Sequence, residues 1–247
     1  MATNTKIEKA LYGPSLAEVA LGAILGLGLG VVVAAVYLVF KPVETVKQLP
    51  KEISRSTIYF QPGSDSSTKG KTWSAKHKQF LAGAAFQVSE DELNAWATAG
   101  GTPPPPPKPA AKPADKGKPA KPAEAPKPEE KAAAADATGF IIPSTPNFRV
   151  VGDKLQIGMK CTLNYFGLTH DVVVITTGDF RKVGDQVVFV PVTVHFGSCP
   201  LHMLPAASNA LANYLLSKQK FTDEMRLAWT KVGSVTIEGG LLKFAVQ

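Results

Sequence analysis

The sequence predicts an α+β protein, in which one N-terminal transmembrane helix precedes a mainly antiparallel sheet domain covered by one or two helices. Three observations support this. The stretch Val19–Phe40 is apolar and uncharged, a Pro/Ala/Lys tract interrupts the middle of the chain, and short alternating strands separated by turn residues fill the C-terminal part. The 247 residues leave room for one sizeable domain beside the other segments.

The apolar stretch Val19–Phe40 is long enough to cross a membrane as a helix. At about 1.5 Å per residue it would measure roughly 33 Å, against a hydrocarbon core of about 30 Å. Ser15 and Glu18 form an S-x-x-E capping box, which predicts where the helix starts. The stretch exceeds the apolar part of a typical cleaved signal peptide, so we expect a tail over 1–14 and a retained anchor over 15–41.

Small residues recur every four positions inside this stretch and share one helix face. They are Gly22, Gly26, Gly30 and Ala34. Small residues let two helix backbones approach closely in lipid, where packing drives association. The pattern predicts a homodimer, or docking onto another membrane protein, through the span.

Basic residues flank the span on both sides. Lys6 and Lys9 precede it, and Lys41, Lys47, Lys51 and Arg55 follow it. Counting charges favours a cytoplasmic C-terminal side. We nevertheless expect the anchor in the bacterial inner membrane with the C-terminal domain outside the cytoplasm, because the rule is weak for large translocated domains and a long proline-rich tract suits an envelope spacer. Both orientations stay open at this point.

The net charge of +7 is spread along the chain and is not gathered in one segment. Nucleic-acid binding needs basic residues on one face, usually with aromatic side chains for stacking. The Lys-rich tract contains no aromatic residue. We therefore expect no nucleic-acid partner.

The tract over 101–138 is built from Pro, Ala, Lys and a few acidic residues, and it begins with five prolines at 103–107. It offers no large apolar side chain to bury, so it predicts disorder with polyproline II character. After a juxtamembrane linker over 42–70, a helical segment is expected over 71–100. A second S-x-x-E box marks one of its helix starts, at Ser89 and Glu92.

The helical segment predicts how the tract is used. Trp73, His77 and Phe80 fall on one helical face, which suits packing against another element. We expect 71–100 to pack on the C-terminal domain, which would make the tract an internal loop. The alternative is a stalk between the membrane and the domain.

The domain over 139–247 begins as strands separated by turns. Gly152-Asp153, Gly184-Asp185 and Gly239-Gly240 each predict a hairpin turn. Apolar residues alternate over 155–163 and 188–195, and Pro191 predicts an edge or a bulge in the second run. Helices are expected over 205–220 and from Thr222, followed by strands over 231–238 and 241–246. The helices would cover one sheet face and leave an apolar groove.

Residues suited to chemistry are few. No hydrolase, zinc-protease, redox or nucleotide-binding motif occurs, and we expect no cofactor. His195, Cys199 and His202 form a weak candidate metal site without a fourth ligand. Cys161 and Cys199 belong to no C-x-x-C pair, which leaves a disulfide and two buried thiols as alternatives.

Two short motifs support a resemblance. One is Val88-Ser89-Glu90-Asp91-Glu92-Leu93-Asn94, and the other comprises Phe189-Val190-Pro191, Phe196-Gly197 and Pro200-Leu201. With the N-terminal span, this layout resembles the YpmS-like family of single-pass membrane-anchored bacterial proteins. The resemblance covers 16–40 and about 86–247, and the Pro/Ala/Lys tract departs from it. It implies a span, a short helix, strands and a late helix, and it implies no catalytic residues.

These features predict a non-enzymatic, membrane-tethered envelope module that binds a partner protein, a cell-wall component or an apolar ligand such as a lipid. Two alternatives stay open. One is an envelope hydrolase or thiol enzyme that uses Cys199 with a histidine. The other is a structural subunit of a membrane complex, docked through the glycine-rich span.

Overall fold

The computed structural model describes residues 13–50, 52–54, 57–64, 69–99, 139–219 and 221–247. Its helices are α2 (Leu16–Phe40), α3 (Gly70–Ala82), α4 (Glu90–Thr98), α5 (Pro205–Lys218) and α6 (Asp223–Thr230), with the 3₁₀ turn η2 (Leu201–Met203). Its strands are β1 (Glu44–Thr45), β2 (Tyr59–Phe60), β3 (Phe86–Ser89), β4 (Ile141–Pro143), β5 (Asn147–Val151), β6 (Lys154–Tyr165), β7 (Leu168–Val183), β8 (Gln186–Phe196), β9 (Cys199–Pro200), β10 (Val232–Glu238) and β11 (Leu241–Val246). The predicted α+β class is confirmed.

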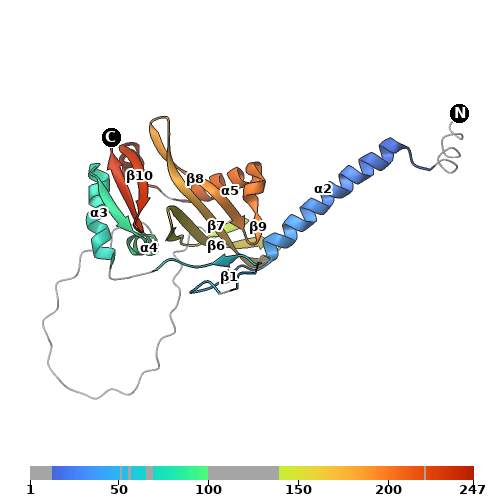
Figure 1. The fold of residues 1–247 in the computed structure, drawn as a ribbon, viewed down its shortest axis with the longest axis horizontal. Helices are drawn as coiled ribbons and strands as arrows, with labels where there is room; N and C mark the ends of the chain where they lie inside the picture. The colour runs from blue at the N-terminus through green and yellow to red at the C-terminus, as the bar shows by residue number, and fades with distance from the viewer. Residues whose placement is uncertain (1–12, 51, 55–56, 65–68, 100–138, 220) are drawn as a thin grey trace, which may run out of the picture.

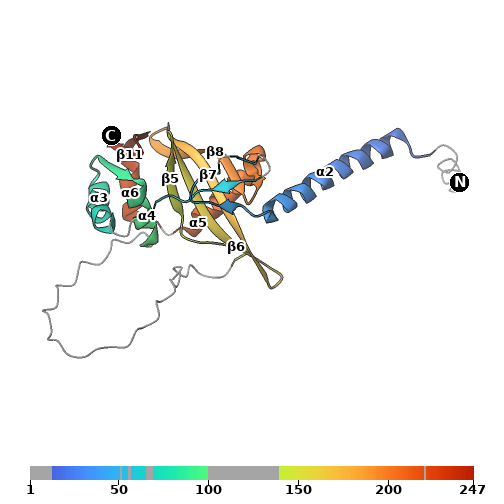
Figure 2. The ribbon, with the colours of Figure 1, turned by 60° about the horizontal axis from the view of Figure 1, so that its bottom comes forward.

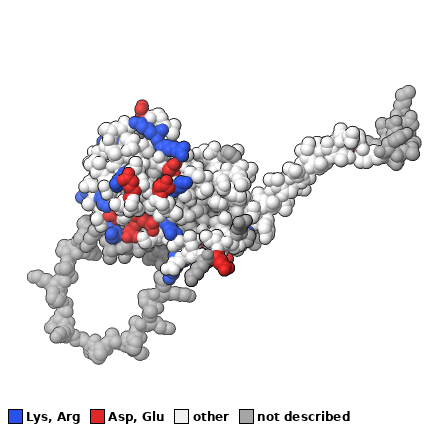
Figure 3. Space-filling view, in the orientation of Figure 1, with Lys and Arg blue, Asp and Glu red and all other residues white. Residues whose placement is uncertain are grey.

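Helix α2 projects away from the rest of the chain, and none of its residues is buried (Figure 1). The predicted capping box is present: Glu18 N donates to Ser15 Oγ, and Ser15 N donates to Glu18 Oε2. Within the described residues, α2 is the one helix long and apolar enough to span a membrane. In Figure 3 its visible surface is uncharged, whereas Lys, Arg, Asp and Glu gather on the domain. An exposed apolar helix of this length is typical of a membrane anchor or a signal sequence.

The larger sheet is a long antiparallel meander of β6, β7 and β8. Its strand order is β4-β6-β7-β8-β9, and β5 also pairs with β6. The predicted turns at Gly152-Asp153 and Gly184-Asp185 join β5 to β6 and β7 to β8, and Gly239-Gly240 joins β10 to β11. Two further tight turns were not expected from the sequence: one lies between Tyr165 and Leu168 and joins β6 to β7, and the other, Gly197-Ser198, joins β8 to β9.

Pro191 lies at a bulge, as its position in an alternating run predicted. Thr177 pairs with Thr193 and Gly178 pairs with Pro191, so β8 carries one extra residue at this point. β9 pairs only with the end of β8, at His195 and Phe196, so Pro191 also has a free edge. A residue without a backbone N–H is tolerated at such a place.

The smaller sheet joins segments that are far apart in the sequence. Its order is β10-β11-β3, and residues 86–89 pair with 241–244. The segment 71–100, which was expected to be helical, also contains a strand: β3 separates α3 from α4. Residues 101–138 lie outside the described residues, but the segments on both sides of them belong to one packed body. The linker that precedes α3 also carries a short parallel pair, β1 with β2.

Helix α4 closes the free edge of β5 with side chains in place of a strand. Asn94 accepts a hydrogen bond from Phe148 N and donates to Phe148 O. Glu90 Oε2 accepts from Val150 N, and its Oε1 accepts from Ser64 N. Covering an edge in this way satisfies backbone groups and blocks pairing with another chain. The two sheets are thereby held together through α4.

Candidate functional site

A cavity of about 540 Å³ lies between helices α3, α4 and α6 and the smaller sheet. Seven of its lining side chains are Trp or Phe: Trp73, Phe80, Phe86, Trp96, Phe221, Trp229 and Phe244. Ligand pockets in proteins measure about 300–1,000 Å³ and are mostly apolar with a few polar groups. The size and lining of this cavity are therefore those of a small-molecule site.

Local sequence explains how the walls form. Trp73, His77 and Phe80 recur at i, i+4 and i+7 on α3 and so share one face. Gly83 ends this helix at φ 72°, a left-handed conformation that suits glycine, and its N–H bonds back to the last turn. The chain then reverses into β3, where Phe86 and Val88 alternate onto the same side.

The aromatic rings that line the wall contact one another. The Trp73 and Trp96 centroids are 5.5 Å apart, and Phe86 and Phe244 stack at 4.5 Å with 3° between their planes. Trp229 contacts Phe244 edge-on at 6.2 Å. All three tryptophans of the chain line this one cavity. The intrinsic fluorescence of the protein therefore reports on the pocket.

Polar atoms in the wall are left without partners. Trp229 Nε1 donates to Val187 O at 2.8 Å, but Trp73 Nε1, Trp96 Nε1 and His77 Nδ1 have no hydrogen-bond partner among the described residues. Trp73 and His77 are only 6% and 7% exposed. An unpaired buried polar group costs about 1–3 kcal/mol. These three nitrogens have almost no accessible surface, so they are buried within the wall and do not face the open space of the pocket.

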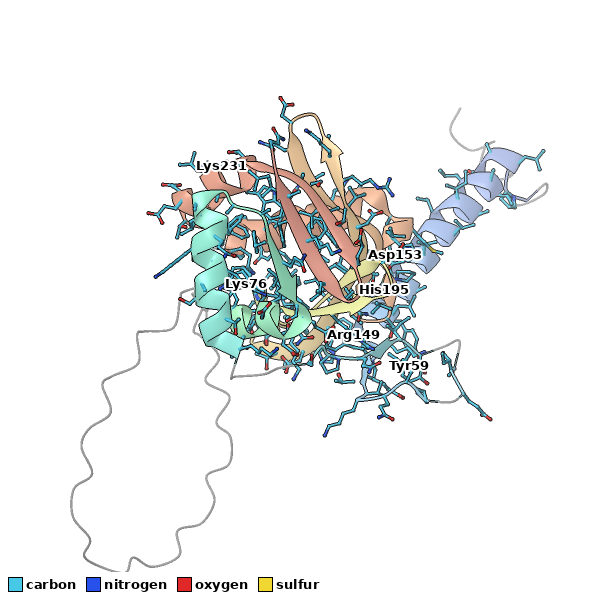
Figure 4. All side chains as sticks on the ribbon, turned by 60° about the vertical axis from the view of Figure 1, so that its left-hand side comes forward. Tyr59, Lys76, Arg149, Asp153, His195 and Lys231 are labelled. Atoms are coloured by element: carbon cyan, nitrogen blue, oxygen red, sulfur yellow. The ribbon has the colours of Figure 1, made fainter. Side chains whose placement is uncertain are left out.

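Charged groups surround the pocket at its rim and behind it. Burial lowers the pKa of His77, and the negative charge of Glu224 opposes this in part, so the imidazole is neutral at pH 7. Behind the wall, Lys76 on α3, which Figure 4 labels, forms an ion pair with the buried Glu92 at 2.6 Å. Arg226 on α6 lines the cavity, is exposed, and makes no ion pair with a described residue.

The predicted metal candidates lie elsewhere, toward the α2 side of the domain, where Figure 4 shows His195. The rings of His195 and His202 are 5.3 Å apart, and His202 Nδ1 lies 3.2 Å from Val194 O. Cys199 is buried and pairs with Phe196 across the β8–β9 turn. Among the residues that the structure describes, no three His, Cys, Asp or Glu side chains are arranged to hold a metal ion. The structure brings together the two histidines and no complete ligand set.

The two cysteines are free and buried, so the disulfide alternative is wrong. Cys161 lies on β6 and Cys199 on β9, with β7 and β8 between them in the sheet. Three strand spacings amount to roughly 14 Å, while a disulfide needs Cα atoms within about 7 Å. Burial raises the pKa of the Cys161 thiol from 9.0 to about 12, and it also raises that of Cys199. A nucleophilic cysteine needs the opposite shift.

We expect both thiols to react slowly with iodoacetamide at pH 8 in the native protein. A pKa near 12 lowers the thiolate fraction of Cys161 by about 1,000-fold relative to a pKa of 9.0. Mass spectrometry of tryptic peptides after timed labelling measures both rates, with the protein in guanidinium chloride as the control. Labelling of native Cys199 as fast as that of the unfolded chain would contradict the expectation.

The same shift has a pH dependence with a defined sign. The pKa of Cys161 is higher in the folded than in the unfolded chain. The stability that the buried, protonated thiol contributes is therefore complete below pH 9.0 and is lost as the pH rises toward 12.

No family model, curated protein or solved structure matches the chain. The resemblance to the YpmS-like family stays a prediction.

The pocket differs from the groove that the sequence predicted. The expected groove drew on apolar residues of the C-terminal domain over 141–246, but much of the wall comes from α3, β3 and α4, which precede the Pro/Ala/Lys tract. The aromatic face of Trp73, His77 and Phe80 was the sequence signal for it. The sequence predicts this face to be a packing surface, and the pairing of β3 with β11 turns it toward a cavity.

Proposed function

We propose that this chain is a single-pass, membrane-anchored module whose aromatic pocket binds an apolar ligand with a hydrogen-bond-accepting, anionic end. The observation that carries the proposal is the 540 Å³ cavity with its seven Trp and Phe side chains. Helix α2 provides the membrane tether, and the domain lies outside the cytoplasm in a bacterial envelope. The function is binding and not catalysis.

The polar part of the ligand follows from the charge of Arg226, which lines the pocket. Arg226 at the rim favours a carboxylate or phosphate, to which guanidinium binds with two parallel hydrogen bonds. A fatty acid or a lipid of similar chemistry combines such an end with an apolar body.

The position of the pocket bears on how a ligand reaches it. Figure 1 shows α3, α4 and β10 at the end of the domain remote from α2. The ligand therefore enters from the aqueous side or from a partner, and not from the lipid around the anchor.

Binding of 9,10-dibromostearate by the full chain in lipid nanodiscs tests the proposal. Bromine quenches tryptophan on contact, and all three tryptophans line the pocket, so we expect saturable quenching that unbrominated stearate reverses. Leu216→Asp and Phe221→Asp place a charge beside the alkyl chain and should weaken binding at least about tenfold. Both residues are exposed, so both variants should fold.

Leu227→Asp is the matched control, because Leu227 is exposed on α6 next to Arg226 but does not line the pocket. Its binding should equal that of the parent chain. Arg226→Gln should weaken dibromostearate more than its methyl ester. Quenching that does not saturate, or that Phe221→Asp and Leu227→Asp affect equally, would refute the pocket as the site.

Of the alternatives, the thiol enzyme is disfavoured by the raised pKa values of both cysteines. Docking through the glycine-rich span stays a prediction. A Cβ added at Gly22, Gly26 or Gly30 would meet nothing within 4 Å, so this helix face is open in the structure.

A further inference from the structure

The turn between β6 and β7 differs in chemistry from the other hairpin turns of the domain. Three of the other turns carry Gly-Asp or Gly-Gly at their tips and the β8–β9 turn carries Gly197-Ser198, whereas this one carries Phe166-Gly167 between Tyr165 and Leu168. Phe166 is fully exposed, and Leu168 is 61% exposed. We call residues 165–168 the β6–β7 tip. It displays apolar side chains where hairpin tips usually carry polar ones or glycine.

Phe166 is also strained in this position. Its φ of 47° is the one positive value found for a non-glycine residue within the described part of the chain. The left-handed conformation costs a bulky residue about 1–2 kcal/mol, and Asn or Gly would adopt it more easily. The exposed Phe166 ring offsets none of this cost by packing within the protein. Stability of the fold therefore does not explain a phenylalanine here.

The tip lies beside the end of the apolar helix. The ring of Phe40, the last residue of α2, is 5.9 Å from the Tyr165 ring and 5.0 Å from that of His170. Figure 2 shows the β6–β7 hairpin projecting next to this end of α2. Phe140, also 61% exposed, adjoins the hairpin through the bond from Asn164 N to Phe140 O.

The junction between α2 and the sheet holds this arrangement in place. Ser198 N donates to Leu38 O at 3.0 Å, and Ser198 Oγ donates to Lys41 O at 3.2 Å. Gly197, at φ 60°, packs so closely under the last turn of α2 that a Cβ would overlap Val39 O. The hairpin and the helix end are therefore positioned by several contacts.

We propose that the β6–β7 tip inserts into the interfacial layer of the same bilayer that α2 enters. The inference rests on the proposed role of α2 as a retained membrane anchor. Phe166, Leu168 and Phe140 would contact the boundary between headgroups and acyl chains, where aromatic and apolar side chains of surface-bound segments reside. Burial in lipid accounts for an exposed and strained phenylalanine. A second attachment point fixes the domain on the membrane, with its pocket directed away.

Depth-dependent quenching of an introduced tryptophan tests the inference. The full chain carrying Phe166→Trp is reconstituted in 3:1 phosphatidylcholine/phosphatidylglycerol vesicles, with phosphatidylcholine brominated either near the headgroup or near the ends of its acyl chains. We expect at least about twofold more quenching than in the parent chain, with blue-shifted emission. Asp185→Trp is the matched control, because Asp185 occupies the hairpin turn at the opposite end of β7, and it should show no added quenching.

Leu27→Trp, within α2, separates this inference from the proposed anchor. Quenching of Leu27→Trp without quenching of Phe166→Trp overturns the inference and leaves the anchor standing. Absence of quenching in both overturns the anchor. Phe166→Asn relieves the backbone strain, so this variant should melt at the same or a higher temperature. When it is combined with Leu168→Trp, it should reduce the quenching of the new tryptophan. Unchanged quenching there contradicts insertion of the tip.

Discussion

Replacing Asn94 with leucine is expected to lower the free energy of unfolding by about 4 kcal/mol. Asn94 is 2% exposed and bonds to three backbone groups: Phe148 N at 2.7 Å, Phe148 O at 2.8 Å and Ser64 O at 2.9 Å. Leucine has a similar volume, so its effect comes from leaving these groups unpaired. Each such group costs about 1–3 kcal/mol when buried.

Urea unfolding followed by tryptophan fluorescence measures this effect. Asn94→Asp keeps the acceptor for Phe148 N but places a carboxylate oxygen against Phe148 O and Ser64 O, so at pH 7 it should be at least as destabilising as leucine. Thr98→Ala, at an exposed position one turn later on α4, should change stability by less than about 0.5 kcal/mol. A loss below about 1 kcal/mol for Asn94→Leu would show that α4 does not hold the edge of β5.

Replacing Gly178 with valine is expected to cost at least about 3 kcal/mol, or to prevent folding. A Cβ at this position would overlap the Val190 carbonyl oxygen and lie 2.9 Å from the Cα of Pro191. Both atoms belong to the backbone of β8 at the bulge, where the register with β7 shifts, so no side chain can move aside. The substitution should loosen the central strand pair of the larger sheet.

Circular dichroism and thermal melting compare Gly178→Val with Gly178→Ala, which should be less severe. Lys182→Val is the control on the same strand, because Lys182 is exposed and valine suits a strand. An unchanged melting temperature for Gly178→Val would mean that β7 and β8 tolerate a wider separation than the structure has.

Features that depend on neighbouring residues were predicted well. Ser15 and Glu18 predicted the start of the apolar helix, and Gly-Asp or Gly-Gly predicted three hairpin turns that the structure contains. Pro191 predicted an edge or a bulge because proline lacks a donor, and the structure has a bulge there. The turn at Phe166 was missed because phenylalanine at a positive φ is not a turn signal.

Features that depend on distant partners were predicted only in part: packing of 71–100 on the C-terminal domain was expected, but its mode was not. Strand β3 spans four residues, Phe86–Ser89, within a segment that the sequence predicts to be helical. Only its pairing with residues 241–244 stabilises it as a strand. Cys161 and Cys199 left a disulfide open until the sheet order placed two strands between them. Their spacing in the sequence holds no information about that separation.

The sequence by itself determined the exposed apolar helix, the class of the domain and most turns, since capping, periodicity and turn chemistry act within a few residues. Only the tertiary structure decided that the aromatic face of α3 lines a cavity, and that the β6–β7 tip lies beside the end of α2. The physical reason is that both follow from contacts between segments more than 100 residues apart: β3 with β11, and the last turn of α2 with Tyr165 and Ser198. Side-chain burial and backbone pairing of this kind are settled only when the whole chain has folded.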